Sequence, residues 1–379
     1  MLASACAAEG PTQISNSGQG AFEVSLASAG EGFVAAWSDV RDGNAEIYFR
    51  LLNRNGRPAE RERRLTRDEA LSYEPDIRAV GMNLAVAWYD KAPDGKLQAR
   101  LGLWTRDGTL LWARTLSSRE RNGRNPVLTV HGSELFVAWI EDSGTDTSDV
   151  WAGWWNLAGL QANAPQRVAP AGRTTWNLNA DVDATGQGWV VFDARAGTRS
   201  EELFLVRVDR QSAQVLQLTA DDGVPSTYPD LALSGAHAAL AWCDERDGNQ
   251  EVYLAVMPFD ATAWRAPLVP DLESRARRVT NTAGHSVRAS VASNGATAGL
   301  AWSDDTDGGQ HDLFVQLFGR DGASLAGPRR LTTNQTSSLI PSIQPSADGF
   351  ALAWNEHAAP PDGEDGSTGR SEIAFTVVR

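Results

Sequence analysis

One cassette, written seven times, constrains the fold of this chain more than any other feature. Its clearest copies read AWSDVRDGNAEIYF at 36–49 and AWCDERDGNQEVYL at 241–254. Successive cassettes begin 51, 51, 52, 51, 60 and 52 residues apart, counted between the acids that follow the aromatic position: Asp39, Asp90, Glu141, Asp193, Asp244, Asp304 and Glu356. A period near fifty residues, with turn residues and β-rich runs in each copy, is the signature of a β-propeller.

Each copy contains four β segments, so an all-β fold of four-stranded antiparallel blades is expected. The first segment follows a Pro or Asx signal, and the second is the most apolar and ends near a tryptophan. The third is a short run such as 47–49, and the fourth ends in a dipeptide such as Leu65-Thr66. Asn55-Gly56, Asp107-Gly108 and Asp321-Gly322 mark the hairpin between the third and fourth segments.

The ends of the chain are offset from the repeat. The last copy stops after its third segment, and residues 11–15 resemble the missing fourth. We therefore predict a seven-bladed β-propeller over residues 11–379, closed by the N-terminal strand completing the last blade, because closure removes unpaired strand edges. Residues 1–10 form a tail. Six or eight blades are the alternatives if a copy is degenerate or hidden.

Tryptophan and acid recur for reasons that the blade itself supplies. The six tryptophans at the end of segment two are expected to pack between blades: Trp37, Trp88, Trp139, Trp242, Trp302 and Trp354. The acids are expected to cap the next hairpin through backbone N–H groups. The competing interpretation is a cation site. Asp305, Asp307 and Asp312 are weak candidates for calcium ligands, because their spacing resembles an oxygen-rich calcium loop.

Charge and cysteine content restrict the partners. The formal net charge of −14 argues against nucleic acid and anionic membrane surfaces, which both need a cationic footprint. Two cysteines cannot make a disulfide framework, and no apolar run is long enough to cross a bilayer. Ala3-Ser4-Ala5 before Cys6 resembles the end of a bacterial lipoprotein signal, so Cys6 is a candidate lipidation site; an ordinary small-residue tail is the alternative.

Catalytic motifs are absent from the pattern. The five histidines share no repeat position and have no metal-ligand spacing, so neither a hydrolytic triad nor a zinc site is indicated. A glycosidase needs two placed carboxylates, and 48 acidic residues give no means of choosing a pair. No catalytic residue and no cofactor are predicted, with calcium as the one possible exception.

A symmetric scaffold binds asymmetric partners where its pattern breaks. Aromatic and charged residues precede segment one at the expected funnel mouth: Tyr73, Asp76, Trp176, Asp181, Tyr228, Asp230 and Arg288. Such a mixture suits sugar or peptide recognition, and loop packing is the alternative. Two long loops, 357–371 on the acidic face and 258–276 on the opposite face, are further candidates for interaction.

The cassette resembles the repeats of the periplasmic TolB propeller and its relatives. The resemblance rests on Ser38-Asp39, Arg41-Asp42-Gly43-Asn44, Glu46-Ile47-Tyr48 and Arg64-Leu65-Thr66. It spans roughly residues 11–379 and implies a secreted or periplasmic interaction scaffold. The Trp-Ser-Pro-Asp-Gly hairpin of those repeats is absent. The layout is also similar to sialidase-like propellers, but their Ser-x-Asp-x-Gly-x-x-Trp box does not occur, so their activity is not implied.

These features together favour a non-catalytic, extracytoplasmic binding or scaffold module. Its expected partner is a protein on the acidic, loop-bearing face, with no nucleic acid, and membrane contact only through a lipid at Cys6. A monomer is expected. The alternatives are a carbohydrate-binding lectin and a glycoside hydrolase or lyase with carboxylates in the funnel.

Overall fold

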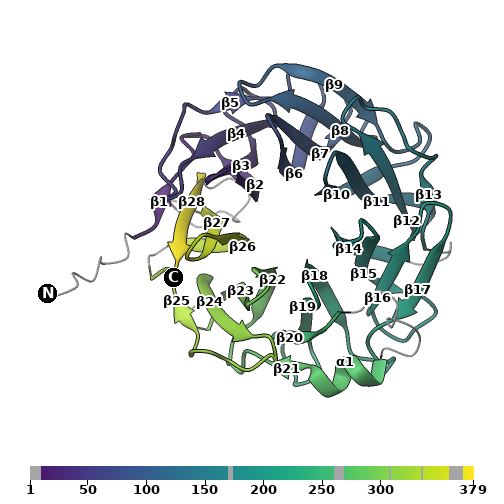
Figure 1. The fold of residues 1–379 in the computed structure, drawn as a ribbon, viewed down its shortest axis with the longest axis vertical. Coiled ribbons are helices and arrows are strands. Elements are labelled where there is room, and N and C mark those ends of the chain that lie inside the picture. Colours follow the sequence, from purple (N-terminus) through teal and green to yellow (C-terminus); the bar gives the residue numbers. More distant parts are fainter. Residues whose placement is uncertain (1–9, 170–173, 260–268, 307–308, 334–335, 358–369) are drawn as a thin grey trace, which may run out of the picture.

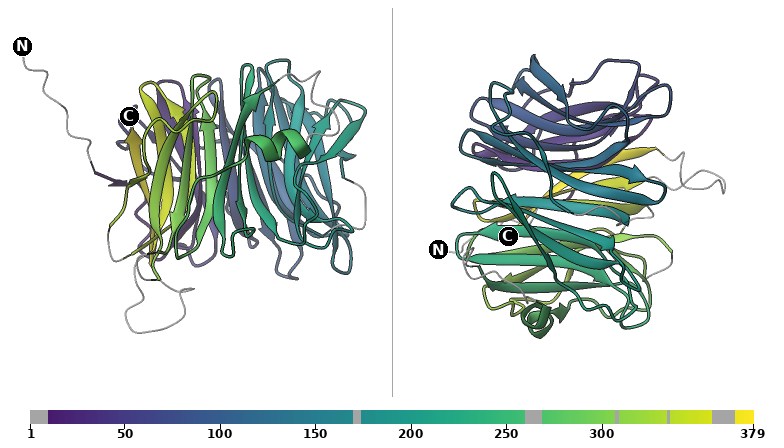
Figure 2. Two further views of the ribbon diagram at one scale, coloured as in Figure 1. Left: turned by 90° about the horizontal axis from the view of Figure 1, so that it is seen from below. Right: turned by 90° about the vertical axis from the view of Figure 1, so that its right-hand side faces the viewer.

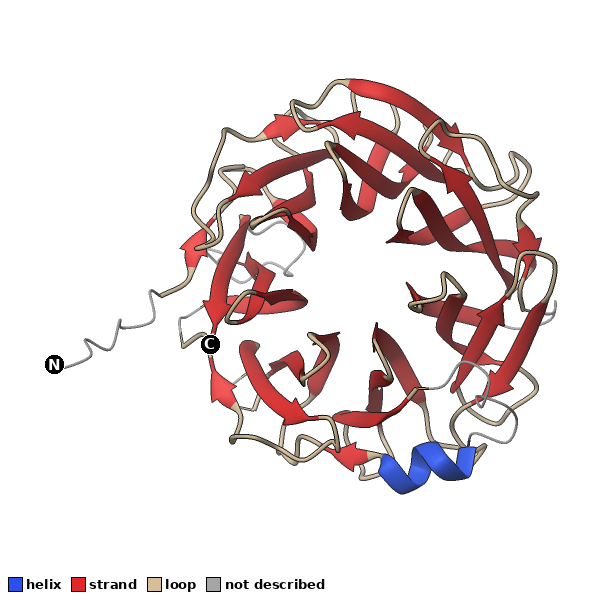
Figure 3. Cartoon of the chain, viewed as in Figure 1, coloured by secondary structure: helices blue, strands red, loops and turns tan. Residues whose placement is uncertain are grey.

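The seven copies form a closed ring of seven four-stranded antiparallel sheets, which confirms the predicted seven-bladed propeller (Figure 1). This computed structural model describes residues 10–169, 174–259, 269–306, 309–333, 336–357 and 370–379. From the side the ring is a thick disc with turns on both faces (Figure 2). Within the described residues one short helix, α1 (Val269–Arg275), lies on the outer wall, and all other regular structure is strand (Figure 3).

Strands run from the channel outward in chain order in blades 1 to 6. Blade 1 consists of β2 (Ala21–Ala29), β3 (Gly32–Asp39), β4 (Glu46–Leu52) and β5 (Arg63–Arg64). Blade 2 consists of β6 (Leu71–Val80), β7 (Asn83–Lys91), β8 (Leu97–Thr105) and β9 (Leu110–Thr115). Blade 3 consists of β10 (Gly123–His131), β11 (Glu134–Gly144), β12 (Thr147–Asn156) and β13 (Gln166–Arg167).

The second half of the chain repeats this order. Blade 4 consists of β14 (Thr174–Val182), β15 (Gly188–Arg195), β16 (Glu202–Val208) and β17 (Ala213–Gln217). Blade 5 consists of β18 (Ser226–Ser234), β19 (His237–Asp244), β20 (Glu251–Pro258) and β21 (Arg277–Arg278). Blade 6 consists of β22 (Ser286–Ser293), β23 (Thr297–Asp304), β24 (Asp312–Gly319) and β25 (Arg329–Arg330). Blade 7 consists of β26 (Ser337–Ser346), β27 (Gly349–His357), β28 (Ser371–Val378) and β1 (Thr12–Gln13).

The N-terminal strand closes the ring, as the offset repeat predicts. In β1, Thr12 pairs with Phe375 and Gln13 with Ala374 of β28. The next residue, Ile14, donates its N–H to the Ile373 carbonyl at 2.7 Å and is fully buried. The outer edge of β28 is therefore covered by the other end of the chain.

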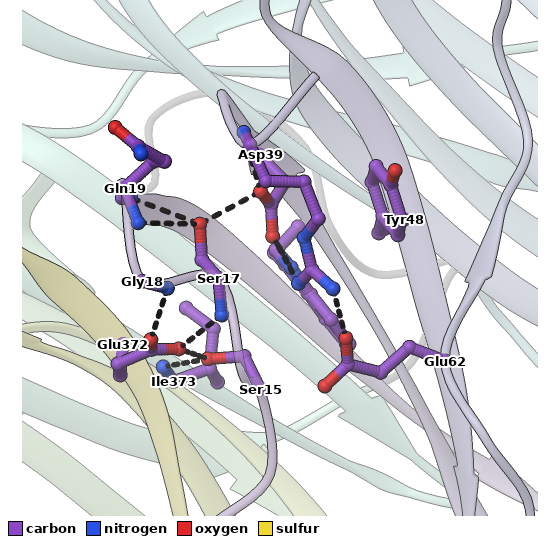
Figure 4. Close-up of polar contacts among 12 residues, drawn as sticks. Ser15, Ser17, Gly18, Gln19, Asp39, Tyr48, Glu62, Glu372 and Ile373 are labelled. Carbon is purple, nitrogen blue, oxygen red and sulfur yellow. Dashed lines mark hydrogen bonds and ion pairs between the residues drawn. The ribbon is translucent and has the colours of Figure 1, made fainter. Parts of the chain in front are cut away.

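Glu372 fastens this closure to blade 1 (Figure 4). Its carboxylate accepts hydrogen bonds from the Ser15 hydroxyl, the Ser17 N–H at 3.0 Å and the Gly18 N–H at 2.8 Å. The Ser17 hydroxyl donates to Asp39 at 2.8 Å, in the first blade. One short segment thus ties the two ends of the chain into a single network.

The repeated tryptophans pack between blades, as expected. Trp37 lies in a buried cluster with residues of blade 7, and Trp242 lies in one with residues of blade 4. Each ring of the set is at most 3% exposed. Burying an indole of this size contributes several kcal/mol, so these side chains hold neighbouring blades together.

The recurrent acid serves the tryptophan and the hairpin. The indole N–H of Trp37 donates to Asp39 at 2.9 Å, and the same carboxylate accepts the Arg41 backbone N–H at 3.0 Å. The same indole-to-acid bond joins Trp88 to Asp90, Trp139 to Glu141, Trp242 to Asp244 and Trp354 to Glu356. The acid therefore recurs because a buried indole N–H and a tight turn both require an acceptor.

Asp193 does not belong to this set, although the sequence pattern placed it among the seven recurrent acids. In blade 4 it is Ala194 that faces Glu202, the pairing that Asp244 makes with Glu251 in blade 5. The aromatic position is Phe192, which has no N–H to satisfy, so the acid slot holds alanine. Asp193 instead accepts the backbone N–H groups of Asn177 at 2.8 Å and of Tyr228 at 3.0 Å.

The outer dipeptide and a buried acid fix the fourth strand to the third. The Thr66 hydroxyl accepts the Ile47 N–H at 2.8 Å, and Thr219, Thr280 and Thr332 do the same in their blades. Beside it, a buried acid at the start of strand three pairs with an arginine from strand four: Glu46 with Arg64, Glu251 with Arg278 and Asp312 with Arg330.

Blade 4 lacks that arginine, which yields a first prediction. Gln217 occupies its position, opposite Phe204, and burial raises the pKa of fully buried Glu202 to about 7. Because that pKa exceeds the unfolded value, the cost of ionising Glu202 in the fold grows as the pH rises from about 4.5 through 7. Gln217→Arg should supply a counter-ion and raise the free energy of unfolding by about 1–2 kcal/mol at pH 8.

Chemical denaturation at pH 4 and pH 8 measures this effect. The gain should vanish at pH 4, where Glu202 is protonated in both states. Gln217→Met, which has similar length and no charge, is the control and should show no pH-dependent gain. Equal gains at both pH values would contradict the pairing with Glu202.

Several sequence expectations fall on residues outside this description. Cys6 and most of the 357–371 loop lie outside the described residues, as do residues 260–268 of the 258–276 loop. The last part of that loop forms α1, which the sequence did not predict; its Leu272 packs into the core of blades 4 and 5. Cys243 is a buried free thiol. No helix in the described ranges is long and apolar enough to span a membrane.

Candidate functional site

Every innermost strand has a β-bulge near the same face of the disc. The bulges interrupt the pairing of the first two strands, for example between Tyr73 and Asp76 in β6 and between Thr227 and Asp230 in β18. In six blades the residue at the bulge apex has a φ between 48° and 58°, in the left-handed region: Glu23, Glu74, Asn125, Tyr228, Arg288 and Ile340. Bulges re-aim side chains, and these apex residues line the mouth of the channel.

A channel runs through the ring between the seven innermost strands. Its volume is about 610 Å³, within the range of small-molecule sites. Five residues that the sequence marked as ligand-binding candidates line it, namely Asp76, Asp181, Tyr228, Asp230 and Arg288. The channel therefore brings together residues that are more than two hundred positions apart in sequence.

The three aspartates already have partners in neighbouring blades. Asp76 accepts the Leu128 N–H of blade 3 at 2.7 Å, and Asp230 accepts the Val291 N–H of blade 6 at 2.8 Å. Asp181 accepts the Leu233 N–H of blade 5 at 2.8 Å. The inner edge of each ring strand has no strand to pair with, so these carboxylates satisfy its N–H groups.

Burial sets the protonation of two of these carboxyls. It raises the pKa of both Asp181 and Asp230 to about 6, while the backbone donors hold the shift back. Asp76 also receives the Ser25 hydroxyl at 2.9 Å and pairs with Arg78 at 2.5 Å. These aspartates connect the blades, and a ligand would compete with those contacts.

Glu74 differs from these aspartates, because its carboxyl accepts no N–H from a neighbouring blade in the described part of the chain. Its side chain makes no hydrogen bond within the described part of the chain, although it lines the channel mouth. Its backbone N–H donates to the Glu23 carboxylate at 2.8 Å, which places the two acids side by side. Burial, together with the charge of Glu23, raises the pKa of Glu74 to about 7. At neutral pH this carboxyl is partly protonated and can donate a hydrogen bond.

Arg288 is the complementary group at the mouth. Its guanidinium lies 4.3 Å from the centre of the Tyr228 ring, and both residues occupy bulge apices of adjacent blades. Among the described residues no carboxylate lies within ion-pair distance of Arg288, and the side chain is exposed. A cation that is held in place by stacking but lacks an anion is suited to bind one.

The other two candidates lie beside the mouth and do not line the channel. Tyr73 packs against Tyr89 within blade 2, with ring centres 5.7 Å apart and ring planes tilted by 34°. Trp176 is 41% exposed at the bulge of blade 4, where its backbone N–H donates to the Asp193 carboxylate at 3.3 Å. Trp176 can extend a binding surface outward from the mouth, whereas Tyr73 packs within its blade.

The weak calcium candidates that the structure describes, Asp305 and Asp312, are engaged with different partners. Asp312 pairs with Arg330 and accepts the Thr332 hydroxyl at 3.0 Å, and Asp305 accepts the His285 N–H at 2.6 Å. Asp307 lies outside the described residues. Across the part of the chain that the structure describes, no group of three or more His, Cys, Asp or Glu side chains is arranged to hold a metal ion.

Sequence reasoning missed Glu23, Glu74, Asn125 and Asn177, which line the mouth. Their signal is positional: Glu23, Glu74 and Asn125 hold the apex slot of the first segment, which Tyr228 and Arg288 occupy in later copies. In copy two the aromatic Tyr73 drew attention from its neighbour Glu74. An alignment of the copies on the bulge would have placed Glu74 in the apex set.

Comparison with known proteins shows the fold. The chain matches no protein-family model and no curated protein. The solved structure of polysaccharide lyase Uly1 aligns with a TM-score of 0.56 at 10% identity, over 96% of this chain and 91% of that one. A prolyl endopeptidase aligns with a TM-score of 0.54 at 15% identity, over 94% of this chain and 47% of that one. The Hadza microbial sialidase Hz136 gives 0.50 at 11%, over 88% and 73%.

These similarities do not extend to activity. The chain spans about half the length of the prolyl endopeptidase. Identities of 10–15% among these proteins accompany a shared ring of β-sheets and carry no residue-level correspondence. The structural neighbours are β-propellers that include hydrolases, sialidases and lyases.

Proposed function

We propose that this propeller is an extracytoplasmic binding module that holds an acidic saccharide in the mouth of its central channel. The observation that carries the proposal is Arg288, an exposed guanidinium stacked on Tyr228 and facing a channel of about 610 Å³. Although the chain has a net charge of −14, no carboxylate of the described residues pairs with this arginine. A ligand carboxylate would fill the vacant side of that guanidinium.

The remaining mouth groups suit the hydroxyls of a sugar ring. Glu74, with a pKa of about 7, can donate from its protonated form. The Asn125 side chain has no hydrogen-bond partner within the described residues, and the Asn177 amide donates to Asp193 at 2.7 Å while lining the channel. Charged and amide side chains around a rigid pocket of this size suit a polar ligand such as a sugar.

The pH dependence of binding tests the role of Glu74. Ionised Glu74 repels a ligand carboxylate, whereas protonated Glu74 donates to it, so affinity should fall as the pH rises through about 7. Calorimetric titration with an oligogalacturonate should show about tenfold weaker binding at pH 8 than at pH 6, near 1.4 kcal/mol. The ligand's own carboxylates stay ionised over this range.

Glu74→Gln is the matched variant, because it keeps the size and removes the titration. Its affinity should be nearly constant between pH 6 and pH 8. A wild-type profile that is equally flat would contradict the involvement of Glu74. Neutral maltohexaose is the ligand control and should bind weakly at both pH values.

A saccharide-cleaving enzyme is the second candidate. Glu74 and Glu23 lie side by side at the mouth, and a carboxyl with a pKa of about 7 has the value expected of a general acid at neutral pH. This candidate predicts that a bound oligosaccharide is shortened over time and that Glu74→Gln abolishes the shortening. Product analysis by chromatography separates the two functions: intact ligand after prolonged incubation supports binding alone.

The site of action is part of the same proposal. The resemblance to TolB-like repeats and the Ala3-Ser4-Ala5-Cys6 sequence support a periplasmic, cell-surface or secreted location, with Cys6 as the lipid-bearing residue. Metabolic labelling with a lipid analogue, compared between the wild-type chain and Cys6→Ala, tests that assignment.

A further inference from the structure

An arginine inside the cassette fills the same slot in blades 1 and 5. Arg41 pairs with Asp39 at 2.5 Å and with Glu62, and its guanidinium lies 4.4 Å from the centre of the Tyr48 ring. Figure 4 shows this arrangement around Asp39, Tyr48 and Glu62. We call this position the arginine slot. Three groups surround the guanidinium there: the acid that also accepts the tryptophan N–H (Asp39), a second acid (Glu62) and an aromatic ring (Tyr48).

Blade 5 repeats this geometry with its own residues. Arg246 pairs with Asp244 at 2.6 Å and with Glu273 of α1 at 2.7 Å, and lies 5.0 Å from the centre of the Tyr253 ring. Blade 2 fills the corresponding space from strand three, where Arg100 lies 3.5 Å from Asp90 and 5.9 Å from the Trp88 ring. The slot is thus built to hold a guanidinium.

Blade 6 keeps the slot and lacks the arginine. Thr306 stands where Arg41 and Arg246 stand in the copies that read Asp-x-Arg. In its place is a pocket of about 290 Å³, lined by Trp302, Asp304, Thr306, Phe314, Pro328 and Arg330 among others. The lining comes from strands two to four of blade 6, from the turn after β23 and from residues 279–282, which follow β21 of blade 5; none of it belongs to the channel lining.

The groups that contact the arginine elsewhere remain in place around this pocket. Asp304 is 4% exposed, and Phe314 stacks on Trp302 with ring centres 5.8 Å apart and planes 13° apart. The same stack joins Trp242 to Tyr253 beneath Arg246, at 5.7 Å and 26°. Unlike the other repeated indoles with a neighbouring acid, Trp302 makes no N–H bond within the described residues.

Arg330 also lines this pocket. Its guanidinium pairs with Asp312 and lies 6.0 Å from the centre of the Phe314 ring. In blade 1 the equivalent Arg64 pairs with Glu46 beside Arg41, so a second arginine next to the slot accompanies the guanidinium in it. The position of the second acid, Glu62 in blade 1, is taken by Pro328, which leaves room for a ligand stem to enter from the rim.

We propose that the blade 6 pocket binds a guanidinium group supplied by an arginine side chain of a partner polypeptide. The arginine takes in trans the place that Arg41 and Arg246 take in cis, with its charge on Asp304 and its plane over Phe314. A planar, delocalised cation suits a carboxylate beside an aromatic face better than a lysine ammonium, which is compact and strongly hydrated. The net charge of −14 favours basic partners in the same direction.

Titration with N-acetyl-arginine amide, followed by NMR of tryptophan indole N–H groups, tests this proposal. The wild-type chain should bind with a Kd of about 1 mM, and the Trp302 signal should move. N-acetyl-lysine amide should bind at least fivefold more weakly. No saturable shift up to 20 mM arginine amide, or equal affinity for the lysine amide, would overturn the proposal.

Thr306→Arg is the decisive variant, because it rebuilds the cassette of blades 1 and 5 from within. It should fold, melt at a temperature equal to or above that of the wild-type chain, and lose binding of arginine amide. Binding that survives in this variant would place the ligand elsewhere and overturn the proposal. Should Thr306→Arg not fold, Phe314→Leu removes the aromatic face and is expected to weaken binding at least fivefold; unchanged affinity overturns the proposal.

A complementary variant creates a second pocket. Arg246→Thr empties the slot of blade 5 in the manner of blade 6, so its melting temperature should fall. Methylguanidinium should restore part of that loss at millimolar concentration, whereas methylammonium at the same ionic strength should not. Equal effects of the two ions would show that the slot does not recognise guanidinium and would overturn the proposal.

Discussion

A chain that begins at Gly18 is expected to melt about 10 °C below the full-length chain and to self-associate. The truncation removes β1, the buried Ile14 and the Ser15 and Ser17 contacts to Glu372. Loss of the Ile14 side chain costs about 3 kcal/mol, and leaving Glu372 without these donors costs about 2 kcal/mol. The exposed edge of β28 then becomes a template for pairing with a second molecule.

Calorimetry and size-exclusion chromatography measure both parts of this effect. A chain that begins at Gly10 retains every described contact of the closing segment and is the length control. Ser15→Ala keeps the strand and removes one hydroxyl, so it should lower the melting temperature by only a few degrees. A Gly18 chain that stays monomeric and melts with the wild-type chain would show that closure by β1 contributes no stability.

Arg288→Ala should weaken binding of an oligogalacturonate by about 10- to 100-fold, the second large effect that we expect. This substitution removes a guanidinium at the mouth that is held over the Tyr228 ring and pairs with no carboxylate of the described residues. The side chain is exposed and contributes little to packing, so the melting temperature should change by less than about 2 °C.

Two comparison variants make this result specific. Arg119→Ala removes the same charge from an exposed position that does not line the channel, and it should leave the affinity for the oligogalacturonate unchanged. Tyr228→Leu removes the ring that holds Arg288 and should give an intermediate loss. An Arg288→Ala variant that binds like the wild-type chain would contradict the assignment of the ligand carboxylate to this arginine.

The repeat made the ring predictable because its signals are local. Trp37 and Asp39 are two residues apart and hydrogen-bond to each other, so one cassette encodes both the packing and its satisfied donor. The Leu65-Thr66 dipeptide likewise marks the fourth strand through a hydroxyl that accepts the Ile47 N–H. Closure followed from counting segments, since seven copies and one displaced strand leave a single way to pair the last edge.

The channel site was only partly predictable because its contacts are long-range. The sequence drew attention to Asp230, but its acceptance of the Val291 N–H, sixty-one residues on, depends on how adjacent blades are set. Asp193 was misassigned because Phe192 needs no acid, and a motif search looks for the acid regardless. Glu74 was passed over because the bulge adds a residue, and that residue decides which side chain reaches the channel.

The blade 6 pocket shows a third kind of limit. Thr306 by itself indicates no binding site. It becomes informative only because Arg41 and Arg246 occupy the same position in blades 1 and 5. The sequence contains this comparison, but only the contacts of Arg41 with Asp39 and Tyr48 reveal what the slot holds. In this chain the repeat defines the architecture, and the departures from it define candidate binding sites.

A crystal structure of the chain with a bound oligogalacturonate would locate the ligand directly. We expect one sugar ring in the channel mouth, with its carboxylate on Arg288 and a hydroxyl or carboxylate oxygen within hydrogen-bond distance of Glu74. A ligand bound at the rim, for example on Trp176 with an empty mouth, would contradict this expectation. So would saturable binding in solution that leaves no ligand in the channel at full occupancy.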